Sequence, residues 1–191
     1  MEDITLWEAY KNGDRNAFAS IYDLHIRILY KYGSKFTSKP ELVEDAIQDL
    51  FLDLWKNRET IGETDSIKYY LLGALRRRII RKTQKDSRYS PDDELENYDF
   101  DLEPNMEESL IASELKAGDK TQLANAMAQL SKRQKEAVYL KFFQEMDYEE
   151  MAKTMNMNYQ SVRNLVYSAL KILRENVTIL QSLLLFWFFG R

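Results

Sequence analysis

The chain contains no cysteine and a single histidine, and these absences exclude several kinds of chemistry. Without cysteine there are no disulfides and no thiolate ligands for a metal. One histidine, His25, is too few for a histidine metal site, and we expect it to pack at the edge of a core. The sequence also lacks a glycine-rich phosphate loop and a nucleophile–base set. We therefore expect no metal, no cofactor, no small-molecule substrate and no enzymatic activity.

Proline and glycine are also scarce, with three and six residues in a chain of 191. Apolar residues recur at helical spacing, and no clear alternating strand is present. We predict an all-α protein of two small helical domains, a helical bundle and a helix-turn-helix, joined by an acidic linker. The expected bounds are 1–88 and 120–176 for the domains, 89–119 for the linker and 177–191 for an apolar tail.

Basic residues are outnumbered, since the net charge is −4. From Pro91 to Glu108, however, there are nine acidic residues and no lysine or arginine, and without them the net charge would become +5. The acid is concentrated in the linker and the basic charge in the flanking domains, a distribution compatible with a nucleic-acid partner.

No targeting or membrane-spanning segment is evident. The start, Met1-Glu2-Asp3, lacks the basic and apolar regions of a signal peptide. The apolar run Val177–Phe189 is shorter than the ~20 residues that cross a bilayer. We expect a cytoplasmic protein whose tail, Val177–Arg191, folds back on the helix-turn-helix domain, binds an inhibitory partner or touches a membrane surface.

Helix-start signals divide the C-terminal part of the chain. Ser131 and Gln134 have the spacing of a capping box, and Asp147 with Glu150 repeats it with an acidic cap. The second of these signals predicts a brief helix from Tyr148 to about Met155. Upstream, a helical face begins near Met106, and Gly118 is expected to interrupt it.

A third helix is predicted after a tight turn. Asn156 is suited to a left-handed turn, and Asn158 is a good N-cap for a helix to about Glu175. Two helices so joined form a helix-turn-helix, whose second helix reads DNA in the major groove. The alternative is an ordinary helical hairpin with a solvated polar face. The candidate DNA-contacting residues are Asn158, Tyr159, Gln160, Ser161, Arg163, Asn164, Tyr167 and Lys171.

The N-terminal half predicts four helices. The first spans Ile4–Lys11, is ended by Gly13 and is followed by a cap at Asp14. The second runs from Ala17 to about Tyr32, with one apolar face. That face comprises Phe18, Ile21, Tyr22, Ile28, Leu29 and Tyr32.

The third predicted helix, Glu41–Asn57, starts at a capping box of Ser38 and Glu41 with Pro40 in its first turn. Its apolar stripe is Val43, Ile47, Leu50 and Leu54, widened by Phe51 and Trp55. Its polar residues sit away from that stripe, where such charges usually form a solvated face. These residues are Glu41, Glu44, Asp45, Gln48 and Asp49.

The fourth predicted helix, Ile67 to about Lys85, has an outer face crowded with cations and no acid in the same window. Such a face favours contact with phosphates. Two tyrosines, Tyr69 and Tyr70, lie near the start of this helix, and Tyr70 suits the core. The candidate nucleic-acid-binding residues are Lys68, Tyr69, Arg76, Arg77, Arg78, Arg81, Lys82 and Lys85.

Two stretches resemble bacterial sigma factors of the extracytoplasmic-function group. The runs L-S-K-R-Q-K-E-A-V-Y-L-K-F-F, D-Y-E-E-M-A and S-V-R-N-L-V-Y-S-A-L-K-I-L-R, within Leu130–Glu175, resemble region four. The run E-D-A-I-Q-D-L-F-L-D-L-W resembles the region-two helix that binds the polymerase clamp. The resemblance implies that the polar residues of the third predicted helix bind polymerase, with Glu44, Asp45 and Asp49 nearest that partner. The chain departs from the family at Glu145 and Asn156, where glycine is usual, and at Asn158, where serine is usual.

The resemblance implies a sigma factor that binds core RNA polymerase through the clamp helices of its largest subunit and the flap. It would recognise promoter DNA at an upstream and a downstream element, and help to open the duplex. In the family the fourth predicted helix captures flipped bases of the downstream element, which makes Tyr69 and Tyr70 candidates to stack on a base. An anti-sigma factor is a further candidate partner. The alternatives are a stand-alone helix-turn-helix regulator, which would bind duplex DNA by itself, and an interaction protein or membrane-peripheral adaptor organised by the acidic helix and the apolar tail.

Overall fold

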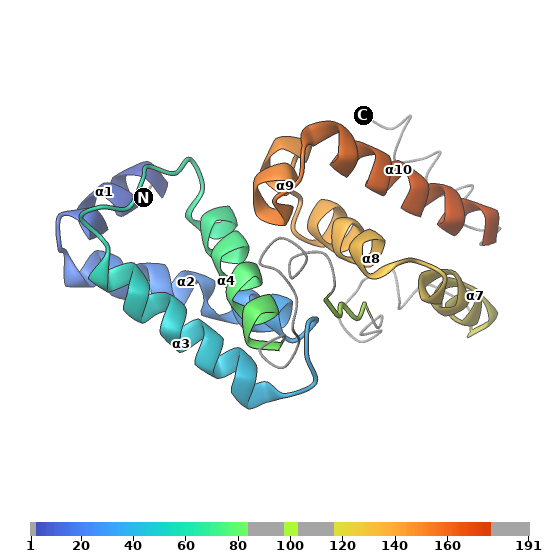
Figure 1. The fold of residues 1–191 in the computed structure, drawn as a ribbon, viewed down its shortest axis with the longest axis horizontal. Helices are drawn as coiled ribbons and strands as arrows, with labels where there is room; N and C mark the ends of the chain where they lie inside the picture. The colour runs from blue at the N-terminus through green and yellow to red at the C-terminus, as the bar shows by residue number, and fades with distance from the viewer. Residues whose placement is uncertain (1–2, 84–97, 103–116, 177–191) are drawn as a thin grey trace. The chain divides into compact units, whose positions relative to one another are not determined.

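A computed structural model describes residues 3–83, 98–102 and 117–176, and it divides the chain into two units (Figure 1). Every regular element in these ranges is a helix, which confirms the predicted all-α class. The first unit contains α1 (Asp3–Lys11), α2 (Arg15–Gly33), α3 (Pro40–Lys56) and α4 (Ile67–Thr83). The second contains α7 (Ala117–Ala128), α8 (Lys132–Val138), the π-helix η1 (Tyr139–Phe143), most of α9 (Tyr148–Met155) and α10 (Tyr159–Asn176).

The first unit is a bundle in which α2, α3 and α4 pack against one another and α1 packs on α2. Trp7 and Tyr10 of α1 are fully buried. The Trp7 indole N–H donates to the Gly62 carbonyl at 3.0 Å, and the Tyr10 hydroxyl donates to the Leu54 carbonyl. These two bonds satisfy the polar ends of two large rings and fix α1 on the end of α3 and the loop that follows.

The turn between α1 and α2 forms as predicted. Gly13 has a φ of 87°, a left-handed conformation that glycine adopts without steric penalty. The Asp14 carboxylate then accepts from the backbone N–H of Asn16 at 2.7 Å and of Ala17 at 3.3 Å. Asp14 is therefore the N-cap of α2.

Helix α2 has two apolar faces, whereas the sequence predicted one. Ile21, Leu29 and Tyr32 are fully buried, as expected, and His25 packs with them with its Nδ1 2.8 Å from the Ile21 carbonyl. Tyr22 is instead 41% exposed. The second face follows the spacing i, i+4 and consists of Phe18, Tyr22, Ile26 and Tyr30.

The predicted capping box of Ser38 and Glu41 is wrong. The N-cap of α3 is Lys39, which is extended and makes no side-chain capping bond, and Pro40 is the first helical residue. A residue before proline is held out of the helical region, so Lys39 must stand outside the helix. The predicted stripe of α3 is confirmed, because Val43, Ile47, Leu50 and Leu54 are all buried.

In the second unit the predicted caps are confirmed. Ser131 Oγ accepts from the Gln134 N–H at 3.3 Å, and Gln134 Oε1 accepts from the Ser131 N–H at 2.9 Å. Asp147 and Glu150 exchange the same two bonds at 2.8 and 2.6 Å. Gln134 also donates from Nε2 to Ser168 Oγ at 2.9 Å, and this bond joins the start of α8 to α10.

Two residues with positive φ flank α9. Glu145 has a φ of 59° and Asn156 a φ of 54°. The left-handed turn predicted at Asn156 is confirmed, and Glu145 adopts a conformation that glycine would adopt without steric cost. The backbone N–H of Ser161 donates to Asn158 Oδ1 at 2.8 Å, so the cap predicted for α10 is also present.

The linker contains ordered apolar residues that its composition did not suggest. Tyr98, Phe100 and Leu102 are buried. In the first unit the Tyr98 ring lies 5.7 Å from that of Phe36, and in the second the Phe100 ring lies 6.0 Å from that of Tyr139.

Gly118 does not interrupt a helix, since it lies within α7. The helix expected near Met106 and the tail Val177–Arg191 lie outside the described residues. The predicted domain bounds stay predictions, and the one between residues 119 and 120 falls inside α7.

Candidate nucleic-acid interface

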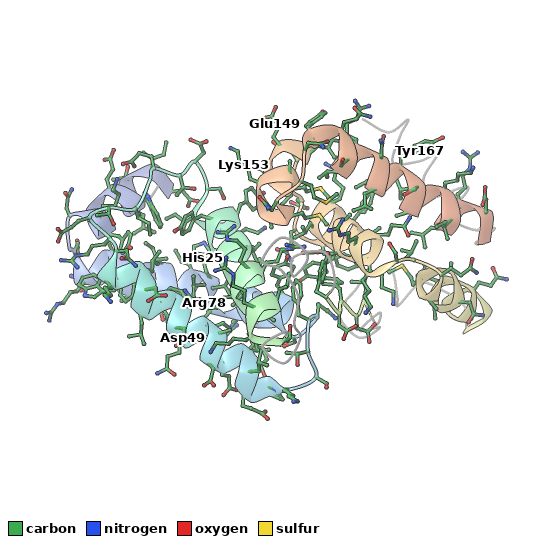
Figure 2. The ribbon with its side chains drawn as sticks, viewed as in Figure 1. His25, Asp49, Arg78, Glu149, Lys153 and Tyr167 are labelled. Atoms are coloured by element: carbon green, nitrogen blue, oxygen red, sulfur yellow. The ribbon has the colours of Figure 1, made fainter. Side chains whose placement is uncertain are left out.

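Helix α10 presents a polar face to solvent, as predicted. Its core side is formed by residues such as Val162 and Val166, which are buried. Tyr167 is 73% exposed, and Figure 2 shows it directed away from α8. Ser161 is half-buried, and the other predicted contacts are exposed. These exposed residues are Asn158, Tyr159, Gln160, Arg163, Asn164, Tyr167 and Lys171.

Contacts between neighbouring side chains order this face. Gln160 Nε2 donates to Asn164 Oδ1 at 3.0 Å, one helical turn away. The Arg163 guanidinium lies 5.8 Å from the centre of the Tyr159 ring, within cation–π range. An ordered amide pair and an exposed guanidinium are groups that pair with base edges in a major groove.

The basic face of α4 is smaller than predicted, because Arg76 does not belong to it. Arg76 is 1% exposed, and its guanidinium lies 4.7 Å from the centre of the Tyr98 ring. The sequence placed Arg76 on the outer face because the ordered segment at Tyr98 was not foreseen. Lys85 lies outside the described residues.

Two cations of α4 are paired with carboxylates of α3. Arg78 Nη2 lies 2.7 Å from Asp53 Oδ2, and Lys82 Nζ lies 2.7 Å from Asp49 Oδ2. Asp49 and Arg78 are labelled on these neighbouring helices in Figure 2. Because no acid lies within α4 itself, neither ion pair was predicted from the sequence, and Asp53 was not named as a candidate. The i, i+4 spacing of Asp49 and Asp53 on α3 is the sequence signal that could have indicated these pairs.

The paired cations line a groove between α3 and α4 in which positive charge is in excess. Arg81 is exposed and Arg77 is half-buried. Burial lowers the pKa of Arg77, an effect that the nearby Tyr70 opposes. The groove is lined by Asp49, Asp53, Ala74, Arg77, Arg78, Arg81 and Lys82.

The two tyrosines at the start of α4 differ. The Tyr70 ring lies 5.2 Å from that of Trp7, which makes it a packing residue of the bundle. Burial raises the pKa of Tyr70, an effect that the nearby Arg77 opposes. Tyr69 is half-buried, and the Lys68 ammonium lies 5.3 Å from its ring centre. Of the two, Tyr69 is better placed to stack on a base.

The acidic face of α3 borders an apolar groove that was not predicted from the sequence. Glu41, Glu44, Asp45 and Gln48 are exposed, as predicted, and Asp49 is half-buried. The second apolar face of α2 and the outer side of α3 enclose a groove of about 670 Å³. Its lining includes Phe18, Tyr22, Ile26, Ile47, Phe51 and Trp55, with Glu44 and Gln48 at its polar edge. Such a groove suits a helix with apolar anchors.

The described residues hold no group of three or more histidine or acidic residues arranged to bind a metal ion. No described helix is long and apolar enough to cross a membrane.

Two family models match the chain in order. The model "Sigma-70 region 2" matches residues 21–89, and "Sigma-70, region 4" matches residues 120–173. Together they cover more than half of the chain.

Curated relatives of the chain include RNA polymerase sigma factors. The extracytoplasmic-function (ECF) RNA polymerase sigma factor SigL of Mycobacterium tuberculosis is 23% identical over 156 residues, which are 81% of this chain and 85% of SigL. The ECF RNA polymerase sigma factor SigX of Bacillus subtilis is 23% identical over 170 residues, which are 86% of each chain.

Solved structures share the fold. CnrH, in complex with the cytosolic domain of CnrY, matches with a TM-score of 0.60 and 15% identity over 95% of this chain and 99% of its own. The sigma factor RpoE of Bartonella quintana, in complex with the anti-sigma factor NepR, matches with a TM-score of 0.57 and 21% identity over 83% and 94% of the two chains.

Proposed function

The chain belongs to the extracytoplasmic-function group of the sigma-70 family, and from this membership we propose how each of its surfaces acts. It is a sigma factor, which binds core RNA polymerase and directs it to promoter DNA for transcription initiation. The observation that carries this conclusion is the presence of both sigma regions in their order along the chain. The protein acts by binding rather than by catalysis, and it works in the cytoplasm, where core polymerase is found.

Helix α10 reads the upstream promoter element. Its N-terminal residues contact base edges, with Gln160 and Arg163 as the principal readers, and Lys171 contacts a phosphate further along the groove. The support is the exposure of this face and the hydrogen bond that orders Gln160 against Asn164. Contacts of this kind fix the register of the protein on the duplex and discriminate among its bases.

Helix α4 binds the melted strand of the downstream element. Arg77, Arg78, Arg81 and Lys82 face the phosphates, and Tyr69 stacks on an exposed base. The support is the excess of cations over acids in the groove that these four residues line. Arg76 is not proposed as a contact, because it is buried.

The outer side of α3 binds the clamp helices of the polymerase largest subunit. A helix of the clamp would pack apolar side chains against Tyr22 and Phe51, which line the groove, while Glu44 and Asp45 meet its cations. The groove and the adjacent exposed carboxylates support this assignment. Charges at such a rim set register and association rate more than affinity. We place the polymerase flap against the second unit.

An anti-sigma factor is a further proposed partner. RpoE, which has a similar fold, is held by the anti-sigma factor NepR. A protein that covered the groove between α2 and α3 would compete with polymerase.

A pull-down with bacterial core RNA polymerase, followed by transcription from a pool of random promoters, tests the proposal. Stoichiometric binding and a consistent start-site motif are expected. Asp45→Lys combined with Tyr22→Asp should abolish the pull-down while helix content is retained, and Glu8→Lys, at an exposed position of α1, is the control. Tight binding of duplex DNA without polymerase would instead identify a stand-alone regulator.

A further inference from the structure

We propose that Tyr148 and Lys141, which lie outside helix α10, are positioning residues for Arg163, a principal reader of the upstream element. They act through Tyr159, so that a series of cation–aromatic and aromatic contacts extends from η1 to the exposed face of α10. The inference rests on the proposed function of α10 and adds to it two residues that are not among the predicted DNA contacts.

The series of contacts begins at the turn before α9. Lys141 Nζ, in η1, donates to the Met146 carbonyl at 3.0 Å and lies 4.8 Å from the centre of the Tyr148 ring. A cation over a ring at this distance is attracted by the π electrons. The ammonium therefore ties Tyr148 to a turn in which Glu145 has a left-handed conformation.

The two tyrosine rings stand at the starts of the two helices that they join. Tyr148 is the first residue of α9, and Tyr159 is the first residue of α10. Their ring centres lie 6.0 Å apart with an interplanar angle of 77°, and this edge-to-face arrangement is favoured for aromatic pairs. Capping bonds of Asp147 and Asn158 fix the first turn of each helix, so both rings start from an ordered backbone.

The last contact reaches the base reader itself. Arg163 lies one helical turn beyond Tyr159, and its guanidinium carbon is 5.8 Å from the centre of that ring. Tyr159 is 45% exposed, and its contact with the half-buried Tyr148 limits the rotamers that so exposed a ring can adopt. Tyr148 thus restricts Tyr159, and Tyr159 restricts Arg163.

This restriction acts on discrimination among bases more than on general affinity. A free arginine side chain loses much rotamer freedom when it pairs with a base, and a guanidinium already held against a ring loses less. The saving applies only to the base with which the guanidinium pairs, such as a guanine with its two acceptors. Phosphate contacts made by other residues do not depend on it. Loss of the ring at Tyr148 should therefore weaken the preference at one base pair and leave the salt dependence of promoter binding unchanged.

The test uses the full-length protein bound to core RNA polymerase. Competitive transcription compares promoters that differ at single base pairs of the upstream element, and Arg163→Ala first locates the base pair that Arg163 reads. The test variant is Tyr148→Leu, and its matched control is Tyr148→Phe, which keeps the ring. A second pair of variants is Lys141→Met, which removes the ammonium, and Lys141→Arg, which retains a cation.

We expect Tyr148→Leu to reduce discrimination at the base pair read by Arg163 by about two- to fivefold, and Tyr148→Phe to retain it. Lys141→Met should cause a smaller loss at the same base pair, and Lys141→Arg should restore the preference. In the Arg163→Ala background, Tyr148→Leu should have no further effect there, because the side chain that it positions is absent.

A merely structural role for Tyr148 predicts a different pattern. The loss would then fall on all base pairs alike and would persist in the Arg163→Ala background, and either result would overturn the inference. Native discrimination in Tyr148→Leu, where Arg163→Ala has lost it, would overturn the inference and retain the function of α10. If Arg163→Ala changes no base preference, the role proposed for Arg163 fails and the inference with it. If Tyr148→Leu does not fold, the two Lys141 variants, which leave both rings in place, decide by the same comparison.

Discussion

Glu145 occupies a backbone conformation that favours glycine, and replacing it should stabilise the second unit. Its φ of 59° is left-handed, which costs an L-residue about 1–2 kcal/mol. Glycine removes that cost but loses about 0.5–1 kcal/mol through the greater freedom of the unfolded chain. Since the Glu145 side chain is exposed, little else changes. We expect Glu145→Gly to raise the free energy of unfolding by about 0.5–1 kcal/mol.

The assay must distinguish the two units, which need not unfold in one transition. Amide hydrogen exchange followed by mass spectrometry meets this need, because protection in α8 and α10 reports on the second unit and protection in α3 serves as an internal reference. Glu145→Ala is the matched control, since it removes the same side chain but keeps the strain. Asn156→Gly should gain less protection than Glu145→Gly, because asparagine tolerates the left-handed conformation better than glutamate. Equal protection in the Gly and Ala variants would show that strain at Glu145 is not relieved by glycine, and the reasoning would fail.

The remaining predictions concern packing, a tertiary hydrogen bond and base readout. Gly33→Ala should destabilise the first unit by about 1–3 kcal/mol, because the added Cβ would lie 2.7 Å from Val43 Cγ1. Urea unfolding should show that a second substitution, Val43→Ala, restores part of the lost stability. If the losses from the two substitutions are strictly additive, the steric explanation is contradicted. Gln134→Glu retains the acceptor of the capping box but removes the donor to Ser168, so we expect urea unfolding to show a loss of about 0.5–1.5 kcal/mol in the free energy of unfolding. Gln134→Ala should lose more stability, because it removes both groups. A Glu variant as stable as the native chain would refute the contribution of the amide donor. Arg163→Ala should reduce discrimination among upstream promoter bases by about 1–3 kcal/mol, measured by competitive transcription, while polymerase recruitment stays intact. An unchanged base preference would show that Arg163 does not read these bases.

The helix-turn-helix could be predicted from the sequence because its signals are local. A capping box needs two residues three positions apart, and a left-handed turn needs one suitable residue. Short stretches of sequence were therefore enough to predict the caps at Ser131, Asp147 and Asn158 and the turn at Asn156. The capping box predicted at Ser38 was wrong for an equally local reason. Its cap spacing was correct, but Pro40 forces the residue before it out of the helix, and that restriction outweighs a side-chain bond.

What the sequence could not reveal depends on residues distant along the chain. The predicted basic face of α4 assumed that no acid was near, whereas Asp53 pairs with Arg78 from twenty-five positions away. Arg76 was assigned to solvent because a linker rich in acid gave no sign that Tyr98 would cover it. The second apolar face of α2 was present as an i, i+4 repeat, but a single helix does not show which of two apolar faces the core will take.

The two left-handed residues that flank α9 also bear on how such a protein tolerates insertions and deletions. Helix α9 has eight residues, and Glu145 and Asn156 fix the chain direction on either side of it. Each residue added to a helix rotates everything after it by about 100°. One insertion in α9 would therefore turn the exposed face of α10 away from the groove that we propose it reads, while the same insertion beyond residue 176 would leave that face in place. We expect natural length variation in this family to be absent between Glu145 and Asn158 and to accumulate in the linker and the tail.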